Sequence, residues 1–459
     1  MRNSSLPKHA PDAPLTVALV GVGEFGASFL FRSGRTANFR VVAAADGDVQ
    51  RVIDAALVAG HHADRIAQCT SAAEAHAAQR RGDFVAVADA SLLMDLPLDF
   101  VVEATGVPEA AARIAAMAIA HGKNVGMVTK ECDSVVGPIL QTKAAAAGLV
   151  CTSVDGDQPS LAMGLVAWSR MLGLEVVCAG KASEYDFVYD PEQESITALG
   201  RTAVIPGMRG LWNVPPAALA RCIDERRERL TAWPHRTAPD LCELSLIANA
   251  TGLKPDIPGL HAPVARTLEL PELMRPRAEG GLFNGVGVLD IFNCLRRADE
   301  ISFAGGVFVV VRCDDRATWR VLRGKGIPVS ADGACALLHN PVHLLGIEAP
   351  MTLLASAVSG QPSGILKPRC DLVARATISL TKGTRLALGE RHTMAGVEPL
   401  LIDAQPAQSG APVPYYMAAG CVLAADVPSG AMLCRKHLQP PVDSVLWALR
   451  EEQDAKFFG

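Results

Sequence analysis

A glycine-rich turn near the N-terminus has the residue types and spacing that bind phosphate. An apolar run, residues 16–20, leads into the pattern Gly-x-Gly-x-x-Gly at Gly21, Gly23 and Gly26. In such a turn the first glycine permits a tight bend and the second lets a pyrophosphate approach the backbone. The third lets the following helix pack closely on the sheet. Because that helix also presents unpaired N–H groups at its start, the stretch is predicted to bind a dinucleotide.

An acidic residue follows at the place where such a unit needs one. A second strand is expected over residues 39–45 and ends at Asp46, about twenty residues after the glycines. A carboxylate there accepts hydrogen bonds from ribose hydroxyls and repels a 2′-phosphate, which favours NAD(H). NADP(H) remains an alternative because Arg51 is near. The expected cofactor contacts are Gly21, Gly23, Glu24, Phe25, Gly26, Asp46, Ala104, Thr105 and Gly106.

Two lysines are candidates for the group that gives or takes a proton at the substrate oxygen during hydride transfer. Lys181 ends an apolar strand expected over residues 174–181 and precedes a proline- and glycine-containing stretch, 182–217, that we interpret as a long loop. Lys130 follows another expected strand, residues 124–128, on the cofactor side, where it could also steady the substrate or the nicotinamide. Each has a structural alternative, since a lysine at a strand end is often only exposed or paired with an acid.

Two further residues complete the catalytic candidates. His261 lies in a turn-rich segment after Asp256, where it could act as an acid or base, bind a phosphate, or simply be solvated. Glu279 precedes two glycines and could bind substrate hydroxyls or cap a turn.

The sequence does not predict a resident metal. The twelve cysteines form no C-x-x-C pair. His339 and His343 have helical spacing, but Pro341 lies between them, which favours a structural role. Asp155 and Asp157 could bind a divalent cation, although turn-forming acids before a helix are the simpler interpretation.

Composition and periodicity predict the architecture. A chain of 459 residues is expected to form two or three domains, and its net charge of −5 gives no reason to expect a nucleic-acid partner. No apolar run is long enough for a bilayer and no signal peptide is recognised, so we expect a cytoplasmic protein without a membrane partner. Strands alternate with helices, expected at 49–59, 61–81 and 108–121, up to about residue 152, which predicts a parallel doubly wound sheet. Beyond 367–368 the composition is β-like.

Several segments together resemble the homoserine dehydrogenase-like proteins with a C-terminal SAF domain. The resemblance rests on residues 103–106, 247–252, 279–281 and 341–344, and on two SAF-like pieces, 376–386 and 425–433. It implies an α/β protein with an N-terminal Rossmann doubly wound domain (14–152), an α+β middle substrate domain (153–366) and a small β-rich SAF domain (367–445). It also implies a homo-oligomer. Because the Asp and Lys pair of true homoserine dehydrogenases is not found in the middle domain, homoserine itself is not the expected substrate.

The sequence is consistent with three alternative functions. The first is an NAD(P)-dependent oxidoreductase acting on a small polar hydroxylated substrate, with or without a phosphate. The second is an enzyme similar to deoxyxylulose-phosphate reductoisomerase, a member of the same group, which would require NADPH and a divalent cation. The third is a non-catalytic nucleotide- or sugar-sensing protein. The SAF region, about residues 368–440, is expected to take no part in hydride chemistry.

Overall fold

The protein is described here by a computed structural model that covers residues 14–36, 38–408 and 410–459. The chain divides into two compact units. Unit 1 contains the residues up to Ser160 together with Leu344–Glu398 and Ala404–Gly459, and unit 2 contains Leu161–His343 and Pro399–Asp403. Unit 2 is therefore an insertion within the chain of unit 1, apart from its short second segment. The three domain boundaries expected from the sequence remain predictions.

A parallel seven-stranded sheet forms the centre of unit 1, in the order β3-β4-β2-β1-β5-β6-β7. The strand order changes direction between β1 and β5, and such a switch point opens a crevice at the carboxyl ends of the strands. This confirms the predicted doubly wound sheet. The strands are β1 Leu15–Val20, β2 Phe39–Ala45, β3 Ile66–Gln68, β4 Phe84–Val87, β5 Phe100–Glu103, β6 Asn124–Met127 and β7 Cys151–Ser153.

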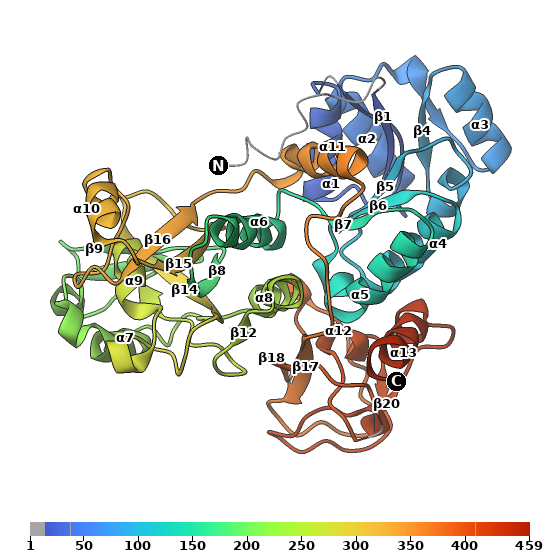
Figure 1. Cartoon of the computed structure of the whole chain (residues 1–459). Coiled ribbons are helices and arrows are strands. Elements are labelled where there is room, and N and C mark those ends of the chain that lie inside the picture. The colour runs from blue at the N-terminus through green and yellow to red at the C-terminus, as the bar shows by residue number, and fades with distance from the viewer. Residues whose placement is uncertain (1–13, 37, 409) are drawn as a thin grey trace. The chain divides into compact units, whose positions relative to one another are not determined.

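Helices connect these strands and bury both faces of the sheet (Figure 1). Side chains alternate along a strand, so Val17 and Leu19 pack with α1 and α2 in one core. Ala18 points to the other face and is equally buried. Near-continuous apolar strands such as β1 follow from this double burial. The helices are α1 Glu24–Ser33, α2 Val49–Ala59, α3 Ala72–Arg80, α4 Pro108–Ala120 and α5 Lys130–Ala146.

Two sequence expectations for this sheet need correction. Residues 61–81 form a 3-10 turn, strand β3 and helix α3 instead of one helix, because Ser71 accepts a hydrogen bond from the Glu74 N–H and starts α3 late. The helix α5 was not predicted. It begins at Lys130, which was expected only to close a strand, and it contains Pro138 in its interior, where proline normally argues against a helix.

The C-terminal segments of unit 1 complete its core. Helix α11, Ala349–Ser359, contributes Ala349 and Leu353 to the core that contains Phe29 of α1. Helix α13, Val445–Phe458, packs along α4 and α5. In Figure 1 these helices, in orange and red, lie against helices from the first third of the chain.

Helix α13 also supplies hydrogen-bond partners for backbone groups next to the proline of α5. Pro138 interrupts the regular pattern of backbone hydrogen bonds in that helix. The Gln453 side chain of α13 accepts a hydrogen bond from the Ile139 N–H (3.2 Å) and donates one to the Val135 carbonyl (3.0 Å). One amide thereby satisfies two buried backbone groups that would otherwise lack partners.

Small β elements follow α11. They are β17 Cys370–Ala376, β18 Val397–Asp403, β19 Val422–Leu423 and β20 Leu438–Gln439, with the short helix α12 Tyr415–Ala418. The two SAF-like pieces form isolated antiparallel bridges, including Leu380 with Val427. The β-like composition is confirmed, whereas the SAF assignment itself stays a prediction.

A mixed sheet forms unit 2, in the order β11-β10-β9-β14-β8-β15-β16, with β12 and β13 also paired to β14. The strands β8, β9 and β14 are mutually parallel and the other pairs along this order are antiparallel. The strands are β8 Val176–Ala182, β9 Phe187–Asp190, β10 Ser195–Ala198, β11 Arg201–Val204, β12 Lys254–Pro255, β13 Val264–Ala265, β14 Val288–Arg297, β15 Val307–Arg312 and β16 Cys335–Asn340. The helices are α7 Leu219–Arg229, α8 Ala238–Thr251, α9 Leu270–Leu273 and α10 Arg316–Gly324, and α6 Gln158–Met171 leads in from unit 1.

The expectation of a long loop at 182–217 is wrong. This stretch contains β9, β10 and β11, a small meander whose apolar side chains, among them Phe187, Tyr189 and Ile196, pack with Trp212 and Trp233. The strands are only four residues long and are separated by turn residues, which hid their alternation.

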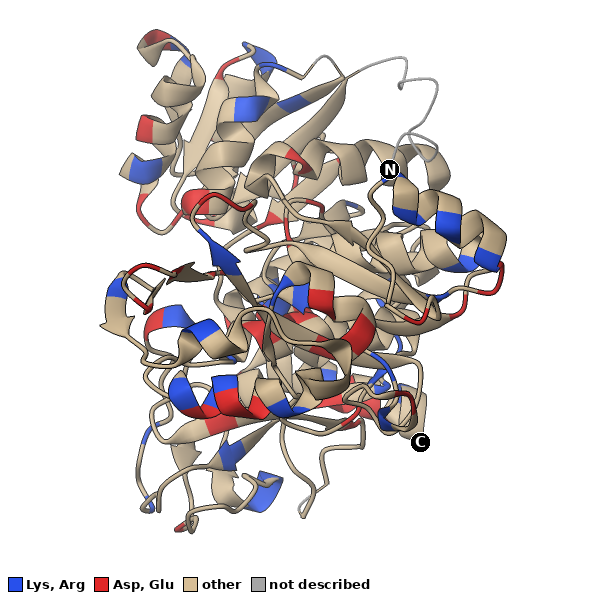
Figure 2. Ribbon diagram, turned by 90° about the vertical axis from the view of Figure 1, so that its left-hand side faces the viewer, with Lys and Arg blue, Asp and Glu red and all other residues tan. Residues whose placement is uncertain are grey.

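On several helices in Figure 2 basic and acidic residues occur together, whereas α10 carries arginines and no acidic residue. Among the described residues, no helix is both long enough and apolar enough to cross a bilayer.

Candidate functional site

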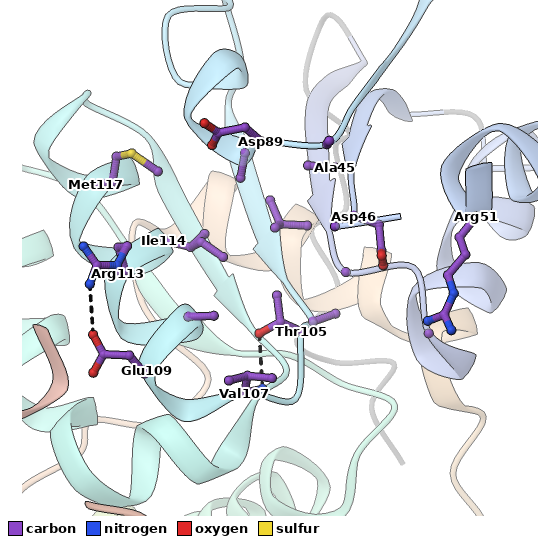
Figure 3. Close-up of a pocket in the computed structure, with 18 residues that line it drawn as sticks. Ala45, Asp46, Arg51, Asp89, Thr105, Val107, Glu109, Arg113, Ile114 and Met117 are labelled. Carbon is purple, nitrogen blue, oxygen red and sulfur yellow. Dashed lines mark hydrogen bonds and ion pairs between the residues drawn. The ribbon is translucent and has the colours of Figure 1, made fainter. Parts of the chain in front are cut away.

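A cavity of about 730 Å³ opens at the carboxyl ends of β1, β2 and β5. Five predicted cofactor residues line it, namely Gly21, Gly23, Asp46, Ala104 and Thr105. Figure 3 shows Asp46 and Arg51 on one side and side chains of α4, such as Arg113 and Met117, on another. The other predicted contacts, Glu24, Phe25, Gly26 and Gly106, are not among the lining residues but flank them in the chain.

The three glycines play different structural parts. Gly21 has φ +94°, and a Cβ there would overlap the Ala104 carbonyl, so no other residue fits. A Cβ on Gly26 would overlap the Gly21 carbonyl, which fits its predicted close helix–strand packing. A Cβ on Gly23, by contrast, would meet no protein atom within 4 Å. Protein packing therefore does not explain why this position is glycine, and the missing side chain leaves open space for a ligand.

Asp46 ties the glycine turn to the end of β2. Its carboxylate accepts hydrogen bonds from the Val22 N–H (2.9 Å) and the Asp48 N–H (3.0 Å), and Asp46 lines the cavity. Arg51 lines the same cavity and lies 3.8 Å from the Asp48 carboxylate, an exposed ion pair. The cavity thus offers both a carboxylate suited to ribose hydroxyls and a cation within the same wall.

The turn after β5 holds the next group of predicted residues. Glu103 is fully buried and accepts hydrogen bonds from the Thr105 N–H (2.8 Å) and hydroxyl (2.6 Å). The Gly106 N–H, in turn, donates to the Thr129 hydroxyl (2.9 Å), which connects this turn to the one after β6. Burial raises the pKa of Glu103 above its ordinary value, and the threonine hydrogen bonds oppose that shift.

Charged side chains gather where β6 and β7 end. Lys130, the first residue of α5, places its Nζ 3.4 Å from Asp157 Oδ2, and Asp157 Oδ1 accepts the Gln158 N–H. Asp155 accepts the Ser160 hydroxyl (2.8 Å). Because neighbouring parallel strands end at the same edge of a sheet, Lys130 and the two acids share this edge with the Thr105 turn. Lys130, a predicted catalytic residue, thus lies beside Asp157, for which a turn-forming role was the simpler expectation.

Asp155 and Asp157 are separated by Gly156, and the structure shows why this position requires glycine. Gly156 has φ +94°, and a Cβ there would overlap the Leu345 carbonyl of the segment that returns to unit 1. The turn can therefore present both carboxylates only with glycine between them.

No cluster of three or more His, Cys, Asp or Glu residues in the described ranges is arranged to hold a metal ion. Asp155 and Asp157 are two oxygen donors, the kind that divalent cations prefer. One oxygen of Asp157 already faces Lys130. The donor set of unit 1 therefore supplies part of a cation site at most.

One histidine from the C-terminal segment also reaches this edge. His392 Nδ1 lies 3.2 Å from Glu131 Oε1, and the imidazole lies against Gly106, where a Cβ would be 3.3 Å from its Cε1. Burial raises the pKa of the Glu131 carboxyl, and Lys130 and His392 oppose that shift. Sequence reasoning did not predict this contact, because 261 residues separate the two partners.

Lys181 lies one residue before the end of β8 in unit 2, but the segment that follows is not a long loop. Its side chain is fully buried and contacts Glu243 and Asp240 of α8, the latter at 2.9 Å. Phe187, a few residues later, already belongs to the next strand. The environment predicted for Lys181 is therefore wrong in this respect, whereas its catalytic role remains a prediction.

The other two candidates in unit 2 have partners of their own. His261 Nε2 lies 2.9 Å from Asp256 Oδ2, and its backbone N–H donates to Asp290 (2.9 Å). Burial raises the pKa of Asp290 to about 6. Glu279 forms a two-point ion pair with Arg312, which lowers the pKa of Glu279. The expected roles of His261 and Glu279 toward substrate remain predictions.

The chain has sequence similarity to an oxidoreductase family. Residues 156–349 match the family model described as "Oxidoreductase DRL, catalytic domain". The match covers less than half of the chain. The match begins at the glycine between Asp155 and Asp157 and spans nearly all of unit 2. No curated protein matches the sequence.

Solved structures resemble parts of the chain. One is 1-deoxy-D-xylulose 5-phosphate reductoisomerase from Zymomonas mobilis in complex with NADPH (17% identity, 51% of this chain and 57% of that chain, TM-score 0.31). Another is an oxidoreductase from Agrobacterium radiobacter in complex with NAD+, L-tartaric acid and magnesium (18%, 39% and 45%, TM-score 0.26). A third is GenD2 from gentamicin A biosynthesis in complex with NAD (22%, 39% and 47%, TM-score 0.27). The chain spans about half the length of these structures.

Proposed function

We propose that the protein is an NAD(P)-dependent oxidoreductase that prefers NAD(H) and acts on a small polar hydroxylated substrate. The observation that carries the proposal is the cavity formed by Gly21, Gly23 and Asp46. Gly23 leaves space there that no protein atom fills, and Asp46 lies at the end of the neighbouring strand. This combination fits the pyrophosphate and the adenosine ribose of a dinucleotide.

The reacting half of the cofactor would extend toward the ends of β5, β6 and β7. When bound, the nicotinamide accepts or donates a hydride. Lys130 would hold a polar or anionic group of the substrate, since its ammonium lies at this edge beside Asp157. The catalytic roles of Lys181, His261 and Glu279, which belong to unit 2, stay predictions. Lys130 could also bind a phosphate group of the substrate, which is tested below by including sugar phosphates among the compounds.

The cofactor proposal is tested by fluorescence titration of the full chain with NADH and NADPH. Wild-type protein is expected to bind NADH more tightly, because Asp46 would repel the 2′-phosphate. Gly23→Val is expected to abolish binding of both, since its side chain would fill the open space. Gly285→Val is the matched control, because a Cβ at Gly285 also meets nothing within 4 Å but lies in unit 2 outside the cavity.

Tighter binding of NADPH would contradict the preference and point to Arg51. Unchanged binding in Gly23→Val would contradict the site itself. The titrated protein is then incubated with hydroxy acids and sugar phosphates while the absorbance of reduced nicotinamide is followed. Saturable binding without turnover of any compound would favour the sensor.

A second candidate function is reductoisomerisation of a phosphorylated hydroxyketone. The observation in its favour is the pair Asp155 and Asp157 beside Lys130. This function predicts that turnover requires Mg²⁺ or Mn²⁺ and stops when EDTA is added. A simple dehydrogenase in which Lys130 holds the substrate would remain active in EDTA. Reductoisomerisation also predicts NADPH as the preferred reductant.

A further inference from the structure

His392 belongs to a turn that the C-terminal segment places at the edge where β5 and β6 end. The turn, Glu390–His392, lies between β17 and β18, and its histidine is part of unit 1. Its imidazole lies against Gly106 on one side and Glu131 on another. The side chain is 39% exposed, so a ligand can still reach it.

The backbone holds this imidazole in an unusual conformation. Arg391 and His392 have φ values of +52° and +54°, in the left-handed region that residues other than glycine seldom occupy. The turn is closed by a hydrogen bond from the Gly389 N–H to the Thr393 carbonyl (2.7 Å), and the Tyr415 hydroxyl accepts the Met394 N–H (2.7 Å). Such a conformation persists only where surrounding contacts fix it. The histidine is therefore held in place.

The contact with Glu131 sets which imidazole nitrogen can act as a base. A carboxylate near Nδ1 favours the proton on that nitrogen, so the neutral ring presents an unprotonated Nε2. Glu131 itself is nearly fully buried and lies next to Lys130 in the chain. This is the arrangement of a general base, with a ring oriented by an acid.

We propose that His392 is a catalytic residue of this oxidoreductase and accepts the substrate proton, with Glu131 as its positioning residue. The inference rests on the proposed function. When a substrate alcohol is oxidised, its C–H hydride passes to the oxidised nicotinamide and its O–H proton passes to His392 Nε2. The products are a carbonyl, the reduced nicotinamide and an imidazolium beside the Glu131 carboxylate. The C–H and O–H bonds break and a C=O bond forms. This replaces the expectation that the C-terminal segment takes no part in the chemistry.

The first test needs no substrate. Diethyl pyrocarbonate modifies accessible histidines, and mass spectrometry of peptides reports each site. In the full chain we expect His392 to be modified without ligand and to lose this modification when NAD+ is saturating. His437, which lies in the same C-terminal segment and accepts the Cys434 N–H, is the control and should react equally in both cases.

The second test uses substitutions that suit the left-handed backbone. His392→Asn and His392→Gly remove the base, and both residues accept positive φ. With the compound found in the substrate panel, each should lower turnover about a hundredfold or more while NADH affinity stays within about twofold. Free imidazole should restore part of the turnover of His392→Gly, which a purely structural role would not allow. Glu131→Gln should lower turnover less than His392→Asn, and His437→Asn should leave it unchanged.

The outcomes separate this inference from the proposed function. If wild-type protein binds neither NADH nor NADPH, or binds without turning over any compound, both are overturned. If it turns over a substrate but NAD+ does not protect His392, or His392→Gly keeps normal turnover or gains nothing from imidazole, only the assignment of His392 is overturned. Lys130, Lys181 and His261 would then be the remaining candidates for the proton acceptor.

Discussion

At the scale of single residues, the acid with the clearest displacement is Asp133 of α5. Burial raises its pKa to about 7, and nearby Glu103 and Glu131 add to the shift, while the Ser153 hydroxyl, which donates to Oδ2 at 3.1 Å, opposes it. A raised pKa in the folded state means that the folded protein binds this proton more tightly than the unfolded chain, where the pKa is about 3.9. The group therefore favours folding at low pH and ceases to do so as pH rises.

The pH dependence of stability follows from that sign. The contribution of Asp133 should be complete below about pH 4 and be lost as pH rises to about 7, by up to about 4 kcal/mol. Asp133→Asn should therefore be more stable than wild type at pH 8, with the difference vanishing near pH 4. Urea unfolding at several pH values measures this. Asp64→Asn, at an exposed aspartate, is the control. Equal midpoints for Asp133→Asn and wild type at pH 8 would contradict the prediction.

Residues with local roles could be predicted from the sequence, whereas those with distant partners could not. Asp46 and Gly26 act within one strand–turn–helix unit, so a fixed spacing finds them. Glu131 follows the strand expected over residues 124–128, and His392 lies in the SAF segment that was expected to take no part in hydride chemistry. Their contact depends on how distant segments fold together, and two successive non-glycine residues with positive φ leave no signature in composition.

At the scale of elements, β8 and α8 of unit 2 are joined by a buried ion cluster. One lysine, Lys181, faces two carboxylates, Asp240 and Glu243, and each of the three side chains is at most 1% exposed. Removing one partner from such a cluster leaves uncompensated charge in the interior, which costs more than the ion pair contributes. The cluster is thus a structural alternative to the catalytic role predicted for Lys181.

Substitution separates these two roles. Lys181→Met should lower the free energy of unfolding by about 3–5 kcal/mol, and the triple change Lys181→Met, Asp240→Asn, Glu243→Gln should recover most of it. Lys325→Met, at an exposed lysine of the same unit, should change little. Urea unfolding and turnover are measured on the same samples. If the triple variant folds normally but has lost turnover, Lys181 acts in the reaction, and if it recovers both, its role is structural.

The same element scale explains which parts of the fold could be predicted. Helix α2 was predicted at its exact bounds, because Asp48 accepts the Gln50 N–H at its start and Gly60, with φ +100°, ends it. Helix α5 was not predicted because Pro138 lies inside it. Gln453 supplies hydrogen-bond partners for the backbone groups next to Pro138. This helix is therefore stabilised by a residue outside its own sequence.

At the scale of the whole molecule, unit 1 is assembled from chain segments on both sides of unit 2. Helix α13 buries Leu446, Trp447 and Leu449, and its preceding Ser444 donates a hydrogen bond to Glu109 of α4. These residues come from the last part of the chain but complete a sheet whose strands all precede residue 154. The C-terminal segment is thus part of the Rossmann-like unit.

A chain ending at Gln361 should therefore fail to bind NADH, and not merely lose turnover. Without α13, the Ile139 N–H and the Val135 carbonyl lose Gln453, and each buried backbone group left without a partner costs about 1–3 kcal/mol, in addition to the apolar surface exposed. Co-expression of residues 362–459 as a separate fragment should restore NADH binding if its role is to complete this unit. The measurement is NADH fluorescence titration together with size-exclusion chromatography. A truncated chain that is monodisperse and binds NADH as tightly as the full chain would show that the α5–α13 contact is dispensable, and His392 could then be studied by deletion instead of substitution.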